Sequence, residues 1–395
     1  MKSINFNLGN LSKIRQFSWD ESKIFIHMLN LSQKYKNIIS LGRGDPDLPT
    51  PKYIIDETVN KLVSGETKYT PPEGLFELRS AIVTKLNNDN NLNYKPSNII
   101  VTNGAQEAIF ITLMSIISEG DEVLLPDPYY MAHRQAIEIC GGKSVLVKTL
   151  LEEEFVPEPK RIESLITEKT KAIILSSPCN PTGAVIDKKT AKSICDIIKK
   201  YNLILISDEL YEKIYFNNND KYISFASFDD MHERTITING FSKFYNMTGF
   251  RVGYLVANEN ILKNILELHH LNTICAPTIS QWAALKALDE PRDYRNILLS
   301  EYQRRRKLIF DFLTRNKIPH NKSEGAFFIF VDIRKTKMSS LEFCEKLLEQ
   351  KNILIFPGSQ YGSSGEGFVR MSFLISLEKL EIALNKFISF YNNNV

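Results

Sequence analysis

The chain has 395 residues, of which 43% are hydrophobic and 24% charged, and its formal net charge is +3 at pH 7. This composition is typical of a globular protein in water, and the length exceeds what one hydrophobic core of ordinary size holds, so we expect two domains. The small net charge excludes a strongly basic nucleic-acid binder, and Arg304–Arg306 falls within a helical pattern that indicates a solvated face. No run of eighteen apolar residues occurs, so we expect no membrane span.

Cysteine and histidine positions argue against disulfides and metal centres. The five cysteines are dispersed and show no CxxC spacing, which favours free thiols in a reducing compartment. His269 and His270 are adjacent, so they would point in different directions on a helix and make a poor metal pair. Residues 1–20 lack the apolar segment of a signal peptide. We therefore expect a cytoplasmic protein that has no bound metal.

The first two thirds of the chain read as an α/β fold. A helical run, Asp20–Tyr35, precedes the Gly/Pro-rich stretch Leu41–Pro51, and from Asn98 short apolar runs alternate with amphipathic helical runs. The apolar runs are continuous, as in strands that are buried on both faces. Strand–helix repetition implies a mostly parallel sheet with helices on both sides. The predicted strands are Ile99–Thr102, Asp121–Pro126, Ser144–Lys148, Ala172–Ser177, Leu203–Asp208, Thr235–Asn239 and Gly253–Ala257, with helices at Ala105–Ile117 and Tyr130–Cys140.

The last hundred residues change character and read as α+β. One long helix is followed by strands that a second helix interrupts. These elements are Asn296–Asn316, Ala326–Asp332, Ser340–Gln350, Ile353–Phe356 and Val369–Phe373. We predict a large domain over residues 49–290 with a sheet of the seven-stranded type. A smaller α+β domain over residues 291–395 should be joined by residues 1–48, so that both chain termini build it.

Several polar residues are predicted to share one edge of the sheet. Asn103 and Gly104 follow one strand, Asp208 ends another, and Lys243 lies just past a third. In doubly wound folds, ligands bind at the carboxyl ends of the parallel strands. The sequence therefore predicts a single binding site that these residues surround.

The segment Gly240–Gly253 carries the most specific pattern in the chain. It reads GFSKFYNMTGFRVG, in which Lys243 stands in a flexible stretch and Arg251 follows eight positions later. The segment resembles the lysine signature of the class I/II aminotransferases, fold-type-I enzymes that use pyridoxal phosphate (PLP). The resemblance implies that Lys243 forms a Schiff base, the internal aldimine, with the cofactor aldehyde. It also implies that Arg251 and Ser242 bind the cofactor phosphate.

Motifs at other strand ends resemble the same family, in the same order. By similarity, Asp208 faces the pyridine nitrogen, and an anion there keeps the ring protonated and able to accept electrons. Tyr211, with Asn180 of the Asn-Pro-Thr-Gly segment, would donate to the ring hydroxyl oxygen. Tyr130 would stack on the ring. Lys243, Asp208 and Tyr130 are the predicted catalytic residues.

The phosphate seat is predicted partly from the residues themselves. Gly104, Ala105 and Gln106 open a helix directly after a strand, and free N–H groups at a helix start bind anions. Tyr69 matches the family segment YTPxxG and would reach the phosphate of a neighbouring subunit. This match implies a homodimer with shared active sites.

Substrate contacts are predicted from the end of the chain and from the Gly/Pro-rich stretch. Arg370 is one arginine in an apolar strand, where an unpaired charge is costly, so we infer that it holds the substrate α-carboxylate. By resemblance, Gly44 and Asn180 also border the substrate. Arg43 is a candidate for binding the second carboxylate of a dicarboxylic substrate, and a surface arginine is the alternative. Two departures from the commonest family pattern are Gly240, where a phosphate-binding Ser or Thr is frequent, and His133, where an aromatic residue is frequent.

The resemblance implies an aminotransferase that moves the amino group of an L-amino acid to a 2-oxo acid such as 2-oxoglutarate. Two alternatives stay open at this point. One is a PLP-dependent lyase that catalyses β-elimination on a sulfur amino acid, which would use the same residues. The other is a non-catalytic protein with the same fold. Nucleic acid and membrane are not expected as partners.

Overall fold

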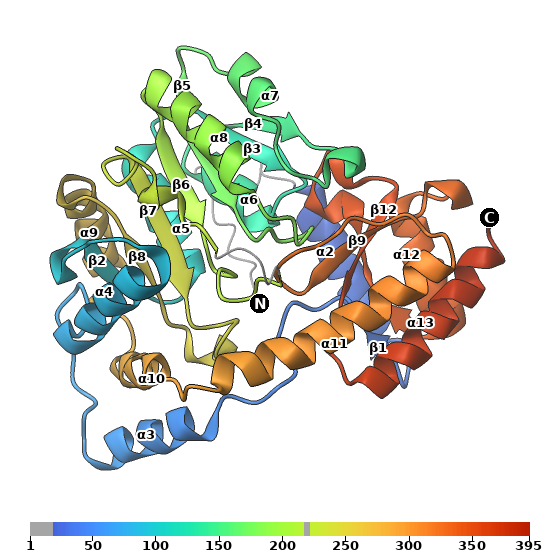
Figure 1. The fold of residues 1–395 in the computed structure, drawn as a ribbon, viewed down its shortest axis with the longest axis horizontal. Coiled ribbons are helices and arrows are strands. Elements are labelled where there is room, and N and C mark those ends of the chain that lie inside the picture. Colours follow the sequence, from blue (N-terminus) through green and yellow to red (C-terminus); the bar gives the residue numbers. More distant parts are fainter. Residues whose placement is uncertain (1–18, 217–221) are drawn as a thin grey trace, which may run out of the picture.

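The computed structural model describes residues 19–216 and 222–395, and its centre is a seven-stranded sheet (Figure 1). The strand order is β2-β8-β7-β6-β5-β3-β4. Neighbouring strands are parallel, except that β8 is antiparallel to both β2 and β7. The strands are β2 (Ile99–Thr102), β3 (Glu122–Asp127), β4 (Lys143–Lys148), β5 (Thr170–Ser176), β6 (Ile204–Asp208), β7 (Thr235–Gly240) and β8 (Gly253–Val256). The prediction of a mostly parallel sheet is confirmed.

The antiparallel strand has a simple cause in the chain. A parallel neighbour needs a long crossover connection, usually through a helix. Residues 241–252 join β7 directly to β8 and contain no α-helix, so the chain reverses at the end of β7. This reversal leaves Lys243 at the edge where the parallel strands end.

Helices cover both faces of the sheet, as strands of continuous apolar sequence require. On one face, α5 (Ala105–Ile116), α6 (Met131–Ile139) and α9 (Glu259–Thr273) pack against the strands. On the other face lie α7 (Pro159–Ser164) and α8 (Lys188–Lys200). The N-terminus of α8 is capped by the Asp187 carboxylate, which accepts the Thr190 N–H at 2.7 Å.

The C-terminal part forms a second, three-stranded antiparallel sheet in the order β11-β12-β9. Its strands are β9 (Phe328–Asp332), β11 (Phe356–Pro357) and β12 (Phe368–Ser372), and its helices are α11 (Tyr294–Arg315), α12 (Ser340–Lys351) and α13 (Leu377–Asn392). From near the other chain end, β1 (Ile39–Ser40) pairs in parallel with β10 (Ile353–Leu354). The N-terminal helix α2 (Asp20–Ser32) lies beside α12. The predicted domain boundaries stay a prediction.

Two sequence expectations need correction here. The single strand predicted at Ile353–Phe356 is two strands, because β10 pairs with β1 whereas β11 pairs with β12. The run Arg304–Arg306 is not wholly a solvated face. Arg305 is buried, and its guanidinium group pairs with Asp47 at 2.7 Å. Helix α11 is therefore tied to the segment that leads into the site.

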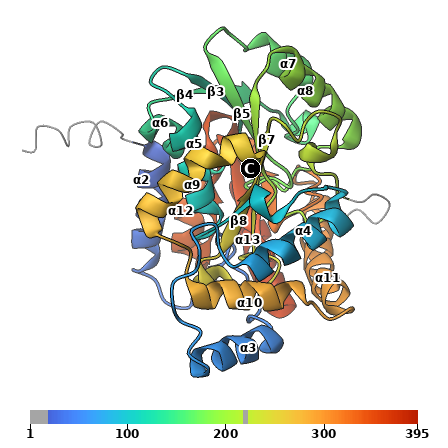
Figure 2. The same ribbon diagram turned by 90° about the vertical axis from the view of Figure 1, so that its left-hand side faces the viewer.

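Three further α-helices occur in the residues that the structure describes. They are α3 (Lys52–Val63), α4 (Phe76–Asn90) and α10 (Thr278–Leu288). Helices α3 and α10 pack on each other, and both views show α3 at the rim of the molecule, away from the sheet (Figures 1 and 2). Within residues 19–216 and 222–395, every helix falls short of the length or the hydrophobicity that crossing a membrane demands.

Candidate active site

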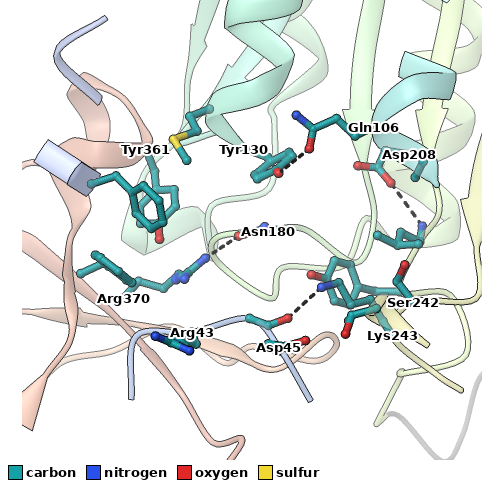
Figure 3. Close-up of a pocket in the computed structure, with 18 of the residues that line it drawn as sticks. Arg43, Asp45, Gln106, Tyr130, Asn180, Asp208, Ser242, Lys243, Tyr361 and Arg370 are labelled. Carbon is teal, nitrogen blue, oxygen red and sulfur yellow. Dashed lines mark hydrogen bonds between the residues drawn. The ribbon is translucent and has the colours of Figure 1, made fainter. Parts of the chain in front are cut away.

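A cavity of about 460 Å³ lies where the large sheet, the small sheet and the N-terminal segment meet. Its walls come from the ends of β6 and β7, the start of α5, the loop Gly42–Asp45 and strand β12 (Figure 3). Most of the predicted site residues line it: Gly44, Ala105, Gln106, Tyr130, Asn180, Asp208, Tyr211, Ser242, Lys243, Arg251 and Arg370, together with Arg43. The structure therefore brings together residues as distant in the chain as Arg43 and Arg370.

Lys243 projects into the cavity from the loop between β7 and β8. Its Nζ donates a hydrogen bond to the carbonyl oxygen of Gly44 at 2.8 Å (Figure 3). Burial lowers the pKa of the amine to about 8. The Asp45 carboxylate opposes this shift, and the guanidinium groups of Arg370 and Arg251 add to it. A lysine amine with a depressed pKa is partly neutral near pH 7 and can act as a nucleophile or a base.

Asp208 ends β6 and is buried beneath the cavity. One carboxylate oxygen accepts the Leu210 N–H at 3.2 Å, and the other lies 3.2 Å from Nε2 of His133. His133 is also buried, on α6. The sequence marked His133 as a departure from the commonest pattern but did not reveal its partner. The pair fixes the orientation of the one carboxylate that lies at this end of the cavity.

The start of α5 forms a cradle that fits a phosphate. Gly104 is the residue before the helix, and its φ of 80° suits glycine. A Cβ there would lie 2.7 Å from Nη2 of Arg251, and a Cβ on Gly253 would lie 2.7 Å from the backbone nitrogen of Ala105. Arg251 donates to the Thr248 carbonyl at 2.9 Å. The two glycines thus let the arginine and the helix N-terminus approach each other.

Arg370 enters the cavity from β12 in the small sheet. Nη1 donates to Oδ1 of Asn180 at 2.9 Å, and Nη2 donates to the carbonyl oxygen of Gly42 (Figure 3). The guanidinium group lies 4.3 Å from the ring centre of Phe328 and 4.6 Å from that of Tyr361. Its buried Nε has no hydrogen-bond partner within residues 19–216 and 222–395. A guanidinium group that packs against two aromatic rings is held in place and can pair with a planar anion through its edge.

Two tyrosines complete the walls. The Tyr130 hydroxyl donates to Oε1 of Gln106 at 3.3 Å. Tyr211 packs edge-on against Phe327 and Phe328. Burial raises the pKa of both hydroxyls, so each remains a proton donor at neutral pH.

Two of the predicted residues do not line the cavity in this chain. Gly104 lies directly behind the wall, against Arg251. Tyr69 is 79% exposed and is not among the residues that line the cavity. Sequence reasoning in turn missed Asp45 and Tyr361, which do line it. Asp45 follows Gly44 directly, so the position of Gly44 in the family pattern could have drawn attention to it.

A family model described as aminotransferase class I and II matches residues 36–387. The chain belongs to this family. It is 41% identical over 362 residues to an aspartate aminotransferase of Pyrococcus abyssi, covering 91% of this chain and 93% of that one. It is 38% identical to aromatic-amino-acid aminotransferase 2 of Thermococcus litoralis, with the same two coverages.

Solved structures agree with this membership. The crystal structure of the aromatic aminotransferase from Pyrococcus horikoshii matches with a TM-score of 0.88 and 39% identity, covering 93% of this chain and 99% of that one. The protein is therefore an aminotransferase, and its fold is the one that the sequence resemblance implied. Members of the family use pyridoxal phosphate.

Proposed function

We propose that this aminotransferase uses pyridoxal 5'-phosphate in the cavity described above. The observation that carries the proposal is the close approach of Arg251 to the start of α5 across Gly104, in the cavity that also holds the half-buried Lys243 with its lowered pKa. A dianionic phosphate fits a helix N-terminus that has an arginine beside it. When bound, the cofactor supplies an electron sink for the bond that breaks at the substrate Cα.

The residues around the ring position have complementary roles in this proposal. Asp208 faces the ring nitrogen as an anion, and His133 holds that carboxylate in place. Tyr211 and Asn180 donate to the ring hydroxyl, and Tyr130 forms the stacking wall. Gly104, Ala105 and Gln106 at the helix start, together with Ser242, add donors for the phosphate.

Lys243 would hold the cofactor through its amine and would act as the base. Its amine takes the proton from the substrate Cα, a step that a positioned base accelerates by roughly 10²–10⁴. The pKa of about 8 leaves a useful neutral fraction of the amine near pH 7. The Gly44 carbonyl, its hydrogen-bond partner, orients it toward the cavity.

Arg370 binds the substrate α-carboxylate, and Asn180 and Gly44 border the same position. A charge-assisted contact of this kind contributes about 1.5–3 kcal/mol. Its second effect is orientation, because a carboxylate fixed at Arg370 sets the direction of the bond between Cα and its hydrogen.

The net reaction that we propose converts an L-amino acid and 2-oxoglutarate into the matching 2-oxo acid and L-glutamate. The amino group moves between the two carbon skeletons, and no external oxidant is needed. Among relatives, the printed names cover aspartate and aromatic amino acids as substrates. We propose an α-amino acid of the L series as donor.

We also propose that two chains assemble into a homodimer and share active sites through Tyr69. This side chain is held outward on an anchored loop. The Thr278 hydroxyl donates to the Lys68 carbonyl at 2.6 Å, and the Gln281 amide donates to the Thr70 hydroxyl at 2.9 Å. Nearby, α3 exposes Val59, Leu62 and Val63, an apolar face of the kind that subunit interfaces cover. The free cysteines support a cytoplasmic location.

An absorption titration tests the cofactor and the reaction together. Adding PLP to the purified protein should produce a visible band, and adding an L-amino acid without any oxo acid should bleach it while one equivalent of 2-oxo acid appears. If no band forms with PLP, the cofactor proposal fails. If the band persists while pyruvate and ammonia accumulate, the protein is a lyase.

A further inference from the structure

The loop Gly42–Asp45 carries two of the contacts that hold the cations of the cavity. The carbonyl of Gly42 accepts from Arg370, and the carbonyl of Gly44 accepts from Lys243. Arg43 stands between them, so its backbone is fixed on both sides. A Cβ on Gly42 would lie 2.7 Å from the ring of Phe356, and one on Gly44 would lie 2.9 Å from that of Phe328. The loop is therefore pressed against the small sheet, and the position of the Arg43 Cα is well defined.

The charge of Arg43 has no partner in the part of the chain that the structure describes. Four cations line the cavity, and three of them, Lys243, Arg251 and Arg370, donate to backbone or side-chain oxygens. Among residues 19–216 and 222–395, none forms a hydrogen bond or an ion pair with the Arg43 side chain, which is exposed. Its neighbour Asp45 exerts the largest charge effect on the Lys243 amine and is not paired with Arg43.

Part of the wall of the cavity is apolar. Phe25 and Leu29 from α2 and Phe356 from β11 line the same cavity, and the rings of Phe25 and Phe356 lie 5.3 Å apart. Figure 3 shows Arg43 below the pair formed by Arg370 and Asn180. A ligand whose α-carboxylate lies at Arg370 would share one cavity with this apolar wall and with the Arg43 side chain.

We propose that Arg43 is the specificity residue that pairs with the second carboxylate of dicarboxylic amino acids and of their 2-oxo acids. The inference rests on the proposed function, because it takes Arg370 as the seat of the α-carboxylate. An arginine fork matches a carboxylate in geometry and charge, and the apolar wall packs against the methylene carbons between the two carboxylates. A neutral amide at the same position would bind the Arg43 guanidinium group much more weakly than a carboxylate does.

The test compares substrates that differ in one charge and hardly in shape. Kinetics of the holoenzyme with glutamate and with glutamine are measured for the wild type and for Arg43→Gln, Arg43→Lys and Arg315→Gln. Arg315, at the exposed end of α11, is the control for loss of one positive charge outside the cavity. We expect Arg43→Gln to lower kcat/KM for glutamate by about 10-fold to 100-fold, the size of one lost charge-assisted contact. In the same variant, kcat/KM for glutamine should change by less than about twofold. Arg43→Lys should retain part of the preference for glutamate over glutamine.

A second measurement uses ligands that cannot react. Glutarate carries two carboxylates and pentanoate one, and their binding to the holoenzyme is followed by the shift of its visible band. Arg43→Gln should weaken the binding of glutarate and leave the binding of pentanoate unchanged. An equal loss for both members of each pair, or no change for either, would overturn the role of Arg43. If the wild type transfers no amino group from any donor, the proposed function itself fails, which is a distinct result.

Discussion

The two ends of the cavity are built in different ways. The end that we propose for the cofactor is built at the strand ends of a single sheet. Its groups range from the buried Asp208 carboxylate, which lies against His133, to the exposed Arg251. The substrate end is assembled from α2, the loop Gly42–Asp45 and β12, which belong to distant parts of the chain. One sheet positions the groups of the first end, whereas the second end depends on how separate segments come together. We therefore expect changes at the first end to abolish the reaction and changes at the second end to alter substrate selectivity.

The largest effect on activity should come from removing the Lys243 amine, at the end of the cavity that we propose for the cofactor. Lys243→Ala should lower turnover by at least about 10²–10⁴, because no other amine lines the cavity within the described chain. Stopped-flow or steady-state transfer from an L-amino acid to 2-oxoglutarate measures this loss. Lys322→Ala, at an exposed position, is the matched control and should leave turnover unchanged. A variant without Lys243 that still transfers amino groups would mean that the base lies elsewhere.

A change at the substrate end should be smaller and selective. We expect Arg370→Gln to lower kcat/KM for α-amino acids by about 10-fold to 100-fold, since one charge-assisted contact to the carboxylate is lost. PLP affinity should change by less than about twofold, because the cofactor contacts lie on the other sheet. Slow turnover of the matching amine, which has no carboxylate, provides the control and should be unaffected. Equal losses for both compounds would show that Arg370 maintains the fold of the site rather than binding the substrate.

The smallest effect should come from Asp45, which lies between the two ends of the cavity. Its replacement should shift the pH dependence of the Lys243 amine. The Asp45 carboxylate raises the pKa of Lys243, so Asp45→Asn should move that pKa below its value of about 8. The groups that also act on the amine are Arg370, Arg251 and Asp208, and they are unchanged in this variant.

The neutral amine is the form that attacks an aldehyde, so the rate at which PLP binds to the apoprotein should rise as pH increases through the pKa. In Asp45→Asn the midpoint of that rise should lie at lower pH, and binding at pH 7 should be faster than in the wild type. Stopped-flow absorbance between pH 6 and 9.5 provides the measurement. Asp196→Asn, on the exposed side of α8, should not move the midpoint. A midpoint that moves upward would contradict the assigned effect of Asp45.

The sequence predicts local features of the molecule better than contacts between distant segments, and the two ends of the cavity differ in the same way. Strand β2 begins and ends where the apolar run Ile99–Thr102 does, because a strand buried on both faces leaves a continuous local pattern. Lys243 and Asp208 were placed at one edge of the sheet for the same reason. Their roles remain predictions, whereas their presence in one cavity is a structural finding.

Contacts between distant segments produce no recognisable pattern in the sequence around each residue. The approach of His133 to Asp208 and the burial of Arg305 against Asp47 join residues 75 and 258 positions apart. Periodicity identified Arg305 as part of a helix but could not show which face another segment covers. The split of Ile353–Phe356 between two sheets has the same origin, because the choice of partner strand is made elsewhere in the chain.

The carbonyl of Gly42 and the side-chain amide of Asn180 have a consequence for discrimination. Both are neutral oxygens, and both already accept hydrogen bonds from Arg370. A ligand that offers another neutral oxygen replaces one neutral hydrogen-bond acceptor with another, so its net gain in binding free energy is close to zero. A carboxylate replaces neutral acceptors with charged ones, which form the stronger bond. If Arg370 binds the α-carboxylate as we propose, these contacts would favour free amino acids over their amides and esters.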